Sequence, residues 1–227
     1  MRSICTAARL TLLGGFELTC DGTPTEVPRT SQRLLAFLGL QRTATRGHAM
    51  ATLWPDAGEQ KAAGSLRTAL WRTQQTAAPI VQAGGEILRL HDWVEVDTDE
   101  LVRTAHGIRE PAVPFRSHEL LPGWYDEWVL VERERLRQLY LRSLERVARA
   151  ELAARRHGSA VEATLVAVRA EPLRESPYRL LMEIHLAEGN YSETLATYRR
   201  YRQLLASELG VRPSPEMHKI LRLLPSA

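Results

Sequence analysis

The chain has 227 residues, enough for one large domain or two small ones. Hydrophobic residues make up 44% of it and charged residues 25%, a composition that excludes a wholly disordered protein. No apolar run approaches the ~18 residues that a membrane span needs, and residues 1–8 are too short to hold the apolar core of a signal peptide. We therefore expect a cytoplasmic protein that does not bind membranes.

The first third of the chain alternates between strand and helix patterns. Strands are predicted at residues 9–13, 16–20 and 25–27, with a tight turn at Asp21-Gly22, and they would form a small antiparallel sheet. Thr30 or Ser31 is expected to cap a first helix with an apolar stripe of leucines. Residues 43–47 break the pattern, and helices are predicted at residues 48–54 and 60–75.

A glycine turn marks the end of this mixed region. Residues 80–83 and 86–90 are predicted to form a hairpin around Gly84-Gly85, followed by a strand at residues 93–97. Sheet patterns then stop. After a proline-containing connection at residues 111–114, the patterns predict helices at residues 128–156, 160–170, 177–188, 192–209 and 215–224.

The later helices resemble a repeat. Large, glycine and aromatic residues fall where a tetratricopeptide repeat places them: Tyr178, Leu181, Gly189, Tyr191 and Tyr198. Two positions depart from the repeat, because Thr194 stands where Ala is preferred and His185 stands where an aromatic residue is preferred. Helix pairs of this kind bury their apolar faces by stacking, which predicts a short α-solenoid. The sequence thus predicts an α+β winged helix-turn-helix domain at residues 1–97 and an all-α tetratricopeptide-like domain at residues 98–227.

The order sheet, helix, helix, loop, helix, hairpin is typical of a winged helix-turn-helix, in which the third helix reads DNA. With Leu66, Leu70 and Thr73 facing inward, the outward side combines basic and polar residues suited to the major groove. An ordinary solvated helix face is the alternative interpretation. The candidate DNA-binding residues on this helix are Lys61, Ser65, Arg67, Thr68, Trp71, Arg72 and Gln75.

Two further places are candidates for DNA contact. Arg29 and Arg33 flank the start of the first predicted helix, where a backbone phosphate could bind; a solvated helix start explains them equally well. Gly84 and Gly85 lack side chains and could approach the minor groove, or they could simply form the turn. All basic residues except Lys61 and Lys219 are Arg, which is explained either by phosphate contact or by a GC-rich genome.

Signals of catalysis or metal binding are poor. There is no phosphate-binding loop ending in Lys and Ser or Thr, and the seven His are scattered without metal-ligand spacing. Cys5 and Cys20 alone make no zinc site, and nothing else suggests an environment in which they would form a disulfide. The carboxylates at residues 126–127, 132 and 134 are expected to be solvated or paired with Arg. We predict no enzymatic activity, no metal and no cofactor.

Four stretches stand out in the chain: LWPD at residues 53–56, GSLRTALWR at 64–72, LLPGWYDEWV at 120–129 and ELGVRPSPE at 208–216. In this order they resemble one family, the SARP-type transcriptional activators of antibiotic pathways in actinobacteria. The chain departs from the family at Thr73-Gln74, where the family continues with Leu-Arg, and in lacking the ATPase module that larger members append.

The resemblance implies a DNA-binding activator that joins an OmpR-type winged helix to a bacterial transcriptional activator domain. Members bind direct repeats near promoters as side-by-side protomers and recruit RNA polymerase, here for an antibiotic biosynthesis cluster. The loop at residues 55–59 is placed to touch polymerase or its sigma subunit through Asp56 and Glu59; alternatively, Glu59 serves only the helix dipole. A tetratricopeptide-like interaction scaffold without direct DNA readout is the competing hypothesis.

Overall fold

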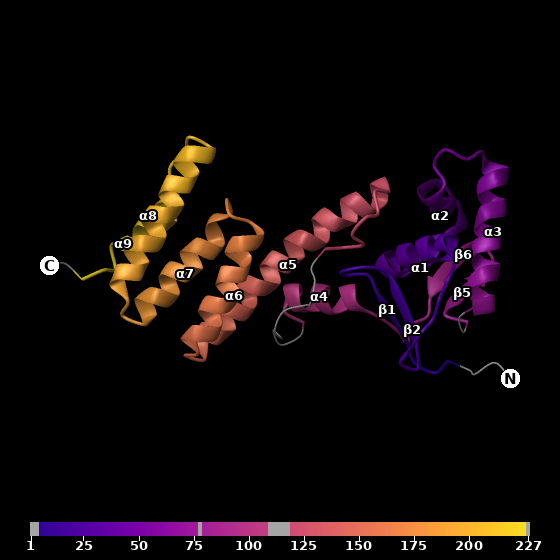
Figure 1. The fold of residues 1–227 in the computed structure, drawn as a ribbon, viewed down its shortest axis with the longest axis horizontal. Helices are drawn as coiled ribbons and strands as arrows, with labels where there is room; N and C mark the ends of the chain where they lie inside the picture. Colours follow the sequence, from indigo (N-terminus) through magenta and orange to yellow (C-terminus); the bar gives the residue numbers. More distant parts are fainter. Residues whose placement is uncertain (1–4, 77–78, 109–118, 226–227) are drawn as a thin grey trace. The chain divides into compact units, whose positions relative to one another are not determined.

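Figure 1 shows the computed structural model of the chain, which describes residues 5–76, 79–108 and 119–225. Contacts between residues divide the chain into two compact units. The first unit comprises Met1–Val102 with Arg116–Arg137, and the second comprises Arg103–Phe115 with Gln138–Ala227. This division differs from the predicted boundary at residue 97 because residues 116–137 lie with the first unit. The predicted connection at residues 111–114 falls outside the described residues.

A four-stranded sheet opens the first unit. Its strands are β1 (Ala8–Thr11), β2 (Glu17–Cys20), β3 (Thr23–Pro24) and β7 (Val94–Val96), in the order β3-β2-β1-β7. β1 pairs antiparallel with β2, as predicted, but parallel with β7. The predicted antiparallel pairing of the first two strands is confirmed. The parallel addition of β7 was not predicted, because local alternation cannot reveal a partner strand that returns more than 80 residues later.

Three helices form the centre of the first unit: α1 (Arg29–Gln41), α2 (Arg46–Leu53) and α3 (Glu59–Thr76). The α1 leucines Leu34, Leu35 and Leu38 are fully buried, as their spacing predicted. The cap prediction for α1 was wrong: Pro28 occupies the N-cap position, and Ser31 is buried and donates its hydroxyl hydrogen to the Ala69 carbonyl, 3.2 Å away. Proline suits a helix start because its ring already fixes φ and because a backbone N–H at this point would have no partner within the helix.

A second sheet of three strands lies beside these helices, with β4 (Thr43–Thr45), β5 (Val81–Gly84) and β6 (Ile87–Leu90) in the order β4-β6-β5. The predicted hairpin between β5 and β6 is confirmed. β4 was interpreted only as a break between helices. Three residues are too few to show alternation, and it is the long-range pairing with β6 that makes them a strand.

Asp97 is the first residue of the helix that follows β7, α4 (Asp97–His106), and its side chain bonds to the backbone just after β1. Its carboxylate accepts hydrogen bonds from the backbone amides of Leu12 and Leu13, with N–O distances of 2.9–3.1 Å. Burial raises the pKa of the Asp97 carboxyl, and these hydrogen bonds act in the opposite direction. The side chain therefore satisfies two amides at the point where β1 ends.

We expect Asp97→Ala to lower the free energy of unfolding by about 2 kcal/mol, because it leaves two partly buried amides without acceptors. Asp97→Asn keeps one acceptor oxygen and should cost clearly less. Urea denaturation of both variants beside the wild type measures the difference. Equal losses for Ala and Asn would show that the amides find other partners.

Residues 119–137 extend the first unit. Leu120 forms a β-bridge with Leu13, and the amides of Gly14 and Leu121 donate to the carbonyls of Glu119 and Leu12, with N–O distances of 2.8 and 2.9 Å. The long helix α5 (Glu127–Ala153) then begins. On α5, Arg133 donates to the carbonyls of Leu120, Leu121 and Trp124, each 2.9 Å away. This segment is thus hydrogen-bonded into the same sheet and core as the first strands.

A fragment that ends at residue 97 is therefore expected to melt at least about 5 °C below a fragment that ends at residue 137, because it lacks these contacts. Thermal unfolding followed by circular dichroism compares the two. Equal melting temperatures would show that residues 119–137 add nothing to the stability of the first unit.

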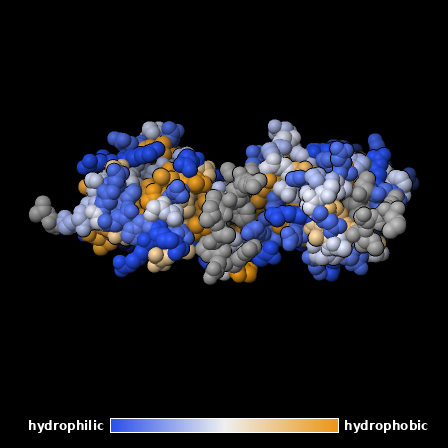
Figure 2. Space-filling view, turned by 60° about the horizontal axis from the view of Figure 1, so that its bottom comes forward, coloured by the Kyte–Doolittle hydropathy of each residue, from blue (hydrophilic) through white to orange (hydrophobic). Residues whose placement is uncertain are grey.

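The second unit is helical. Besides the C-terminal part of α5, it contains α6 (His157–Ala170), α7 (Glu175–Ala187), α8 (Tyr191–Glu208) and α9 (Pro215–Leu221). Tyr178 of α7 and Tyr201 of α8 stack with ring centroids 4.4 Å apart, in a core completed by Met182, Leu205 and Met217. Burial raises the pKa of Tyr201 to about 12, and its hydroxyl donates to the Leu173 carbonyl. Figure 2 shows apolar surface on one face gathered mainly over this unit.

One repeat position that departed from the expected residue type is explained by the structure. Thr194 is fully buried where Ala is preferred, and its hydroxyl donates to the Asn190 carbonyl, so its polar atom is satisfied. Gly189, with φ of +74°, forms the turn between α7 and α8. The helix pair predicted around this glycine is confirmed.

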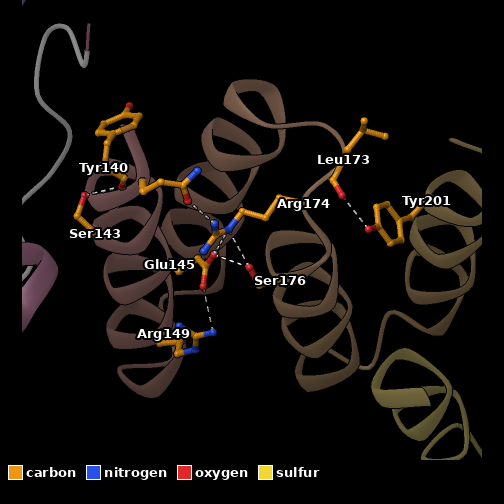
Figure 3. A network of polar contacts seen from close by, with 9 residues as sticks. Tyr140, Ser143, Glu145, Arg149, Leu173, Arg174, Ser176 and Tyr201 are labelled. Carbon is orange, nitrogen blue, oxygen red and sulfur yellow. Dashed lines mark hydrogen bonds and ion pairs between the residues drawn. The ribbon is translucent and has the colours of Figure 1, made fainter. Parts of the chain in front are cut away.

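A buried carboxylate joins α5 to the start of α7. Glu145 accepts hydrogen bonds from Arg174 Nε at 2.9 Å and Ser176 Oγ at 2.6 Å, and Arg174 also donates to Gln138 Oε1. Figure 3 shows these side chains turned toward Glu145, with Arg149 on its other side. Because the charge is paired and hydrogen-bonded, the site fixes the spacing of the helices rather than leaving a reactive carboxylate.

The structure bears on two further expectations, one about carboxylates and one about the cysteines. The carboxylates Glu132 and Glu134 pair with Arg135 and Arg137, as predicted. Cys5 and Cys20 form a disulfide, which the sequence analysis did not expect. Pairing of β1 with β2 brings the two cysteines together, with their Cα atoms 5.6 Å apart.

No helix in the described part of the chain has the length and apolar character needed to cross a membrane.

Candidate nucleic-acid interface

Helix α3 buries one side and exposes the other. Ala62, Leu66, Ala69, Leu70 and Thr73 are buried against the rest of the first unit, which confirms the predicted inner face. The opposite side is exposed, apart from the half-buried Ser65, and it carries the residues that were predicted to bind DNA: Lys61, Arg67, Thr68, Trp71, Arg72 and Gln75. Trp71 has an exposed fraction of 60%, unusual for so large a ring.

Thr73 shows how a polar residue is accommodated on the inner side of α3. Its exposed fraction is 1%, and its hydroxyl donates to the Ala69 carbonyl, 2.8 Å away. The same carbonyl accepts from Ser31 of α1. This small polar contact between α1 and α3 replaces the apolar packing that Leu would give at position 73.

Charge on α3 is one-sided. No Asp or Glu occurs between Gln60 and Gly85, so Glu59 is the one carboxylate of α3 and it lies at the start of the helix. The exposed side carries the positive charges of Lys61, Arg67 and Arg72. Thr68 donates its hydroxyl hydrogen to the Gly64 carbonyl at 2.9 Å, which leaves its methyl group and oxygen lone pairs for an outside partner. Guanidinium, hydroxyl and methyl groups on one exposed helix face are the chemistry used for base edges and phosphates in the major groove.

The β5–β6 hairpin forms the wing. Gly84 and Gly85 are exposed at its tip, and no other atom lies within 4 Å of where a Cβ would stand. Gly85 has φ of +56°, so the turn itself favours glycine. Arg46, the first residue of α2, holds the tip: its side-chain Nε donates to the Gly85 carbonyl at 2.7 Å and its amide to the Glu86 carbonyl at 2.9 Å.

Sequence reasoning missed Arg46 and Arg89. Arg89 is exposed on β6, between Thr43 of β4 and Gln82 of β5, which are exposed as well. The alternation of buried and exposed residues along β6 could have assigned Arg89 to the outer face, whereas the role of Arg46 depends on a contact 39 residues away.

Arg29 and Arg33 have partners inside the first unit. The Arg29 guanidinium lies 3.5 Å from the ring centroid of Trp124, and desolvation lowers its pKa. Arg33 pairs with Asp126, with Nη2 and Oδ1 2.5 Å apart. A DNA phosphate at this helix start would have to compete with Trp124 and Asp126. Neither alternative considered from the sequence, a phosphate site or a solvated helix start, included these partners.

The loop between α2 and α3 exposes two carboxylates. Asp56 and Glu59 are both exposed, and Glu59 is the first residue of α3. The backbone of the loop is ordered by two hydrogen bonds, from the Ala57 amide to the Trp54 carbonyl and from the Ala62 amide to the Gly58 carbonyl. Glu59 thus sits where a carboxylate favours the helix dipole, while Asp56 lies outside any helix.

Comparison with known proteins identifies the family. Residues 99–223, more than half of the chain, match the bacterial transcriptional activator domain. The chain belongs to this family. The predicted resemblance to SARP-type transcriptional activators is thereby confirmed.

Curated relatives of this activator-domain protein are regulators. The regulatory protein AfsR of Streptomyces coelicolor is 29% identical over 235 residues, which cover 94% of this chain and 24% of AfsR. The chain thus spans about a quarter of the length of that relative. The transcriptional regulatory protein MoaR1 of Mycobacterium tuberculosis is 26% identical over 251 residues, covering 96% of this chain and 81% of MoaR1.

A solved structure supports the fold. Mycobacterium tuberculosis EmbR, determined in complex with a low-affinity phosphopeptide, superposes with a TM-score of 0.73 at 22% identity, covering 97% of this chain and 66% of EmbR. The predicted fold class, a winged helix-turn-helix followed by a tetratricopeptide-like helical domain, is confirmed. The matched family is described as a transcriptional activator domain, and MoaR1 is named a transcriptional regulatory protein. In the described residues, no group of three or more His, Cys, Asp or Glu could hold a metal ion.

Proposed function

We propose that the protein is a sequence-specific DNA-binding activator of transcription, with α3 in the major groove and the wing beside it. The observation that carries this proposal is the exposed side of α3, where Lys61, Arg67 and Arg72 accompany Thr68 and Trp71 without a carboxylate after Glu59. Guanidinium groups bind guanine or phosphate, and the exposed threonine methyl can meet a thymine methyl. The match to a family of transcriptional regulators supports the same function.

The finer parts of the proposal follow from the family. We infer that side-by-side protomers bind direct repeats near promoters in the cytoplasm and that they recruit RNA polymerase and its sigma subunit. An antibiotic biosynthesis cluster is the proposed target. We assign Ser65, Gln75, Gly84 and Gly85 to the DNA contact as well; Arg29 and Arg33 would contribute only after leaving Trp124 and Asp126.

Binding to the promoters next to the protein's own gene, measured by footprinting over a range of salt concentrations, tests the proposal. We expect protection of two repeated sites and an affinity that falls with salt, by about 0.9 in the logarithmic slope for each phosphate that the protein binds. Absence of any protected site together with a salt-independent weak affinity would contradict it.

The competing function is a scaffold that binds proteins through stacked helix pairs, without direct DNA readout. The core of α7, α8 and α9 is compatible with it. The two hypotheses differ in the effect of α3: a scaffold does not need Arg67 or Arg72, so their removal would leave its binding to partner proteins unchanged.

A further inference from the structure

A hollow of about 830 Å³ opens in the first unit. Its walls come from α1, α2, the loop that follows α2, Lys61 of α3, and Asp126 with the first two turns of α5. The volume lies within the range of ~300–1,000 Å³ that is usual for sites of small molecules.

Aromatic rings line this hollow. Phe37 of α1 and Trp128 of α5 meet edge to face, with ring centroids 5.9 Å apart and an interplanar angle of 90°. His48 of α2 also lies near Phe37, with ring centroids 5.5 Å apart, and Trp54 adds a second indole ring to the wall. Rings presented at different angles suit a flat aromatic molecule, which can stack on one and meet the edges of the others.

Two nitrogen donors of the wall residues have no hydrogen-bond partner. Among the described residues, Trp128 Nε1 and Arg33 Nε are buried and unpaired. Buried donors in native proteins are nearly always satisfied, and an exception calls for a partner such as a water or a ligand. Both side chains line the hollow, but the two nitrogens themselves are buried beneath its surface, so an acceptor oxygen in the hollow would reach them only after a side-chain shift.

The rim of the hollow is acidic. Asp56 and Glu127 are exposed there, and Glu132 adds a third carboxylate, which is paired with Arg135. Lys61 contributes a single ammonium group, and the Arg33 guanidinium is neutralised by Asp126. The excess of negative charge at the rim favours a ligand with a positive charge. The faces of the indole rings also attract a cation.

We propose that this hollow binds a small aromatic molecule that carries a positive charge and a hydrogen-bond acceptor. The aromatic part lies against Phe37, Trp54 and Trp128, and the cation faces Asp56 and Glu127. The acceptor meets the unpaired nitrogens of Arg33 and Trp128 once these side chains shift to expose them. This ligand site shares Lys61 with the proposed DNA contact and Asp56 with the proposed polymerase contact, but it can be tested without DNA.

Rhodamine 6G, a cationic aromatic dye with a carbonyl acceptor, is a suitable probe, and fluorescein is its anionic counterpart. Titration of the full chain, followed by fluorescence anisotropy, should give saturable one-to-one binding of rhodamine 6G and at least tenfold weaker binding of fluorescein. Ala51→Trp, which fills the hollow from an exposed position on α2, should weaken rhodamine 6G at least tenfold. Ala196→Trp, at an exposed position on α8, is the matched control and should change nothing.

Two conservative variants test the polar contacts. Glu127→Gln removes a rim charge and should weaken the dye about threefold, whereas Glu208→Gln, an exposed carboxylate on α8, should not. Trp128→Phe removes the unpaired nitrogen but keeps a ring, and Trp93→Phe is its control. Circular dichroism checks that each variant is folded. Equal binding of both dyes, unchanged binding by Ala51→Trp and Glu127→Gln, or no saturable binding at all would overturn the proposal.

Discussion

Replacing Arg72 or Arg67 with Ala is expected to weaken binding to the target promoter by about 1–3 kcal/mol each, which is a loss of about 5- to 150-fold in affinity. Both side chains lie on the exposed side of α3, whose inner side is fixed by Leu66, Leu70 and Thr73. Each substitution removes a charge-assisted hydrogen bond to a base or a phosphate, and it leaves the core of the first unit untouched.

Mobility-shift titrations at one fixed salt concentration measure the two variants beside Arg199→Ala, which removes an exposed arginine from α8. The control should bind as the wild type does. If both α3 variants also stay within twofold of the wild type, with unchanged circular-dichroism spectra, α3 does not carry the DNA contact.

A second DNA of unrelated sequence separates the two kinds of contact. When an arginine that binds phosphate is replaced, affinity should fall equally for both DNAs, and the salt dependence should flatten by about 0.9 in the logarithmic slope for each phosphate that is no longer bound. When an arginine that reads a guanine is replaced, affinity should fall mainly for the promoter.

Local patterns were sufficient for the elements that carry the proposed DNA contact. The spacing of Leu66, Leu70 and Thr73 correctly set the inner side of α3, and the paired glycines correctly set the hairpin of the wing. Both depend on residues close together in sequence, so periodicity and turn chemistry determine them. The outward placement of Arg67 and Arg72 then follows without knowledge of any other part of the chain.

Contacts between distant segments could not be predicted in this way. The parallel partner of β1, the strand β4 and the bridge between Leu13 and Leu120 all depend on residues far along the chain. Arg29 and Arg33 illustrate the consequence for function. Their sequence position suggested a phosphate site or a solvated helix start, whereas Trp124 and Asp126, more than 90 residues later, are their partners.

The stretch LLPGWYDEWV at residues 120–129 was noted for its family resemblance, and the structure shows which residues it contacts. Its Trp124, Asp126 and Trp128 contact Arg29, Arg33 and Phe37, respectively, all on α1. The segment that begins α5 is thus attached to the first helix of the winged unit by one cation–π contact, one ion pair and one aromatic pair. This attachment also forms one wall of the hollow described above.

The double substitution Asp56→Ala with Glu59→Ala is expected to abolish activation while leaving promoter occupancy unchanged. Both carboxylates are exposed in or beside the loop that precedes α3. A carboxylate is repelled by phosphate, so DNA is a poor partner for this loop, whereas a basic protein surface on polymerase or its sigma subunit is a good one. Removal of two charge-assisted interactions would prevent recruitment without disturbing the exposed side of α3.

Reconstituted transcription run beside a footprint on the same template measures activation and occupancy together. Asp92→Ala with Glu95→Ala, which removes two exposed carboxylates at the start of β7, is the matched control and should activate normally. If occupancy falls in the test variant, Glu59 acts through the α3 dipole, a contribution of a few tenths of a kcal/mol, and Glu59→Ala alone should then reproduce the loss. Unchanged transcription at equal occupancy would instead exclude the loop as the polymerase contact.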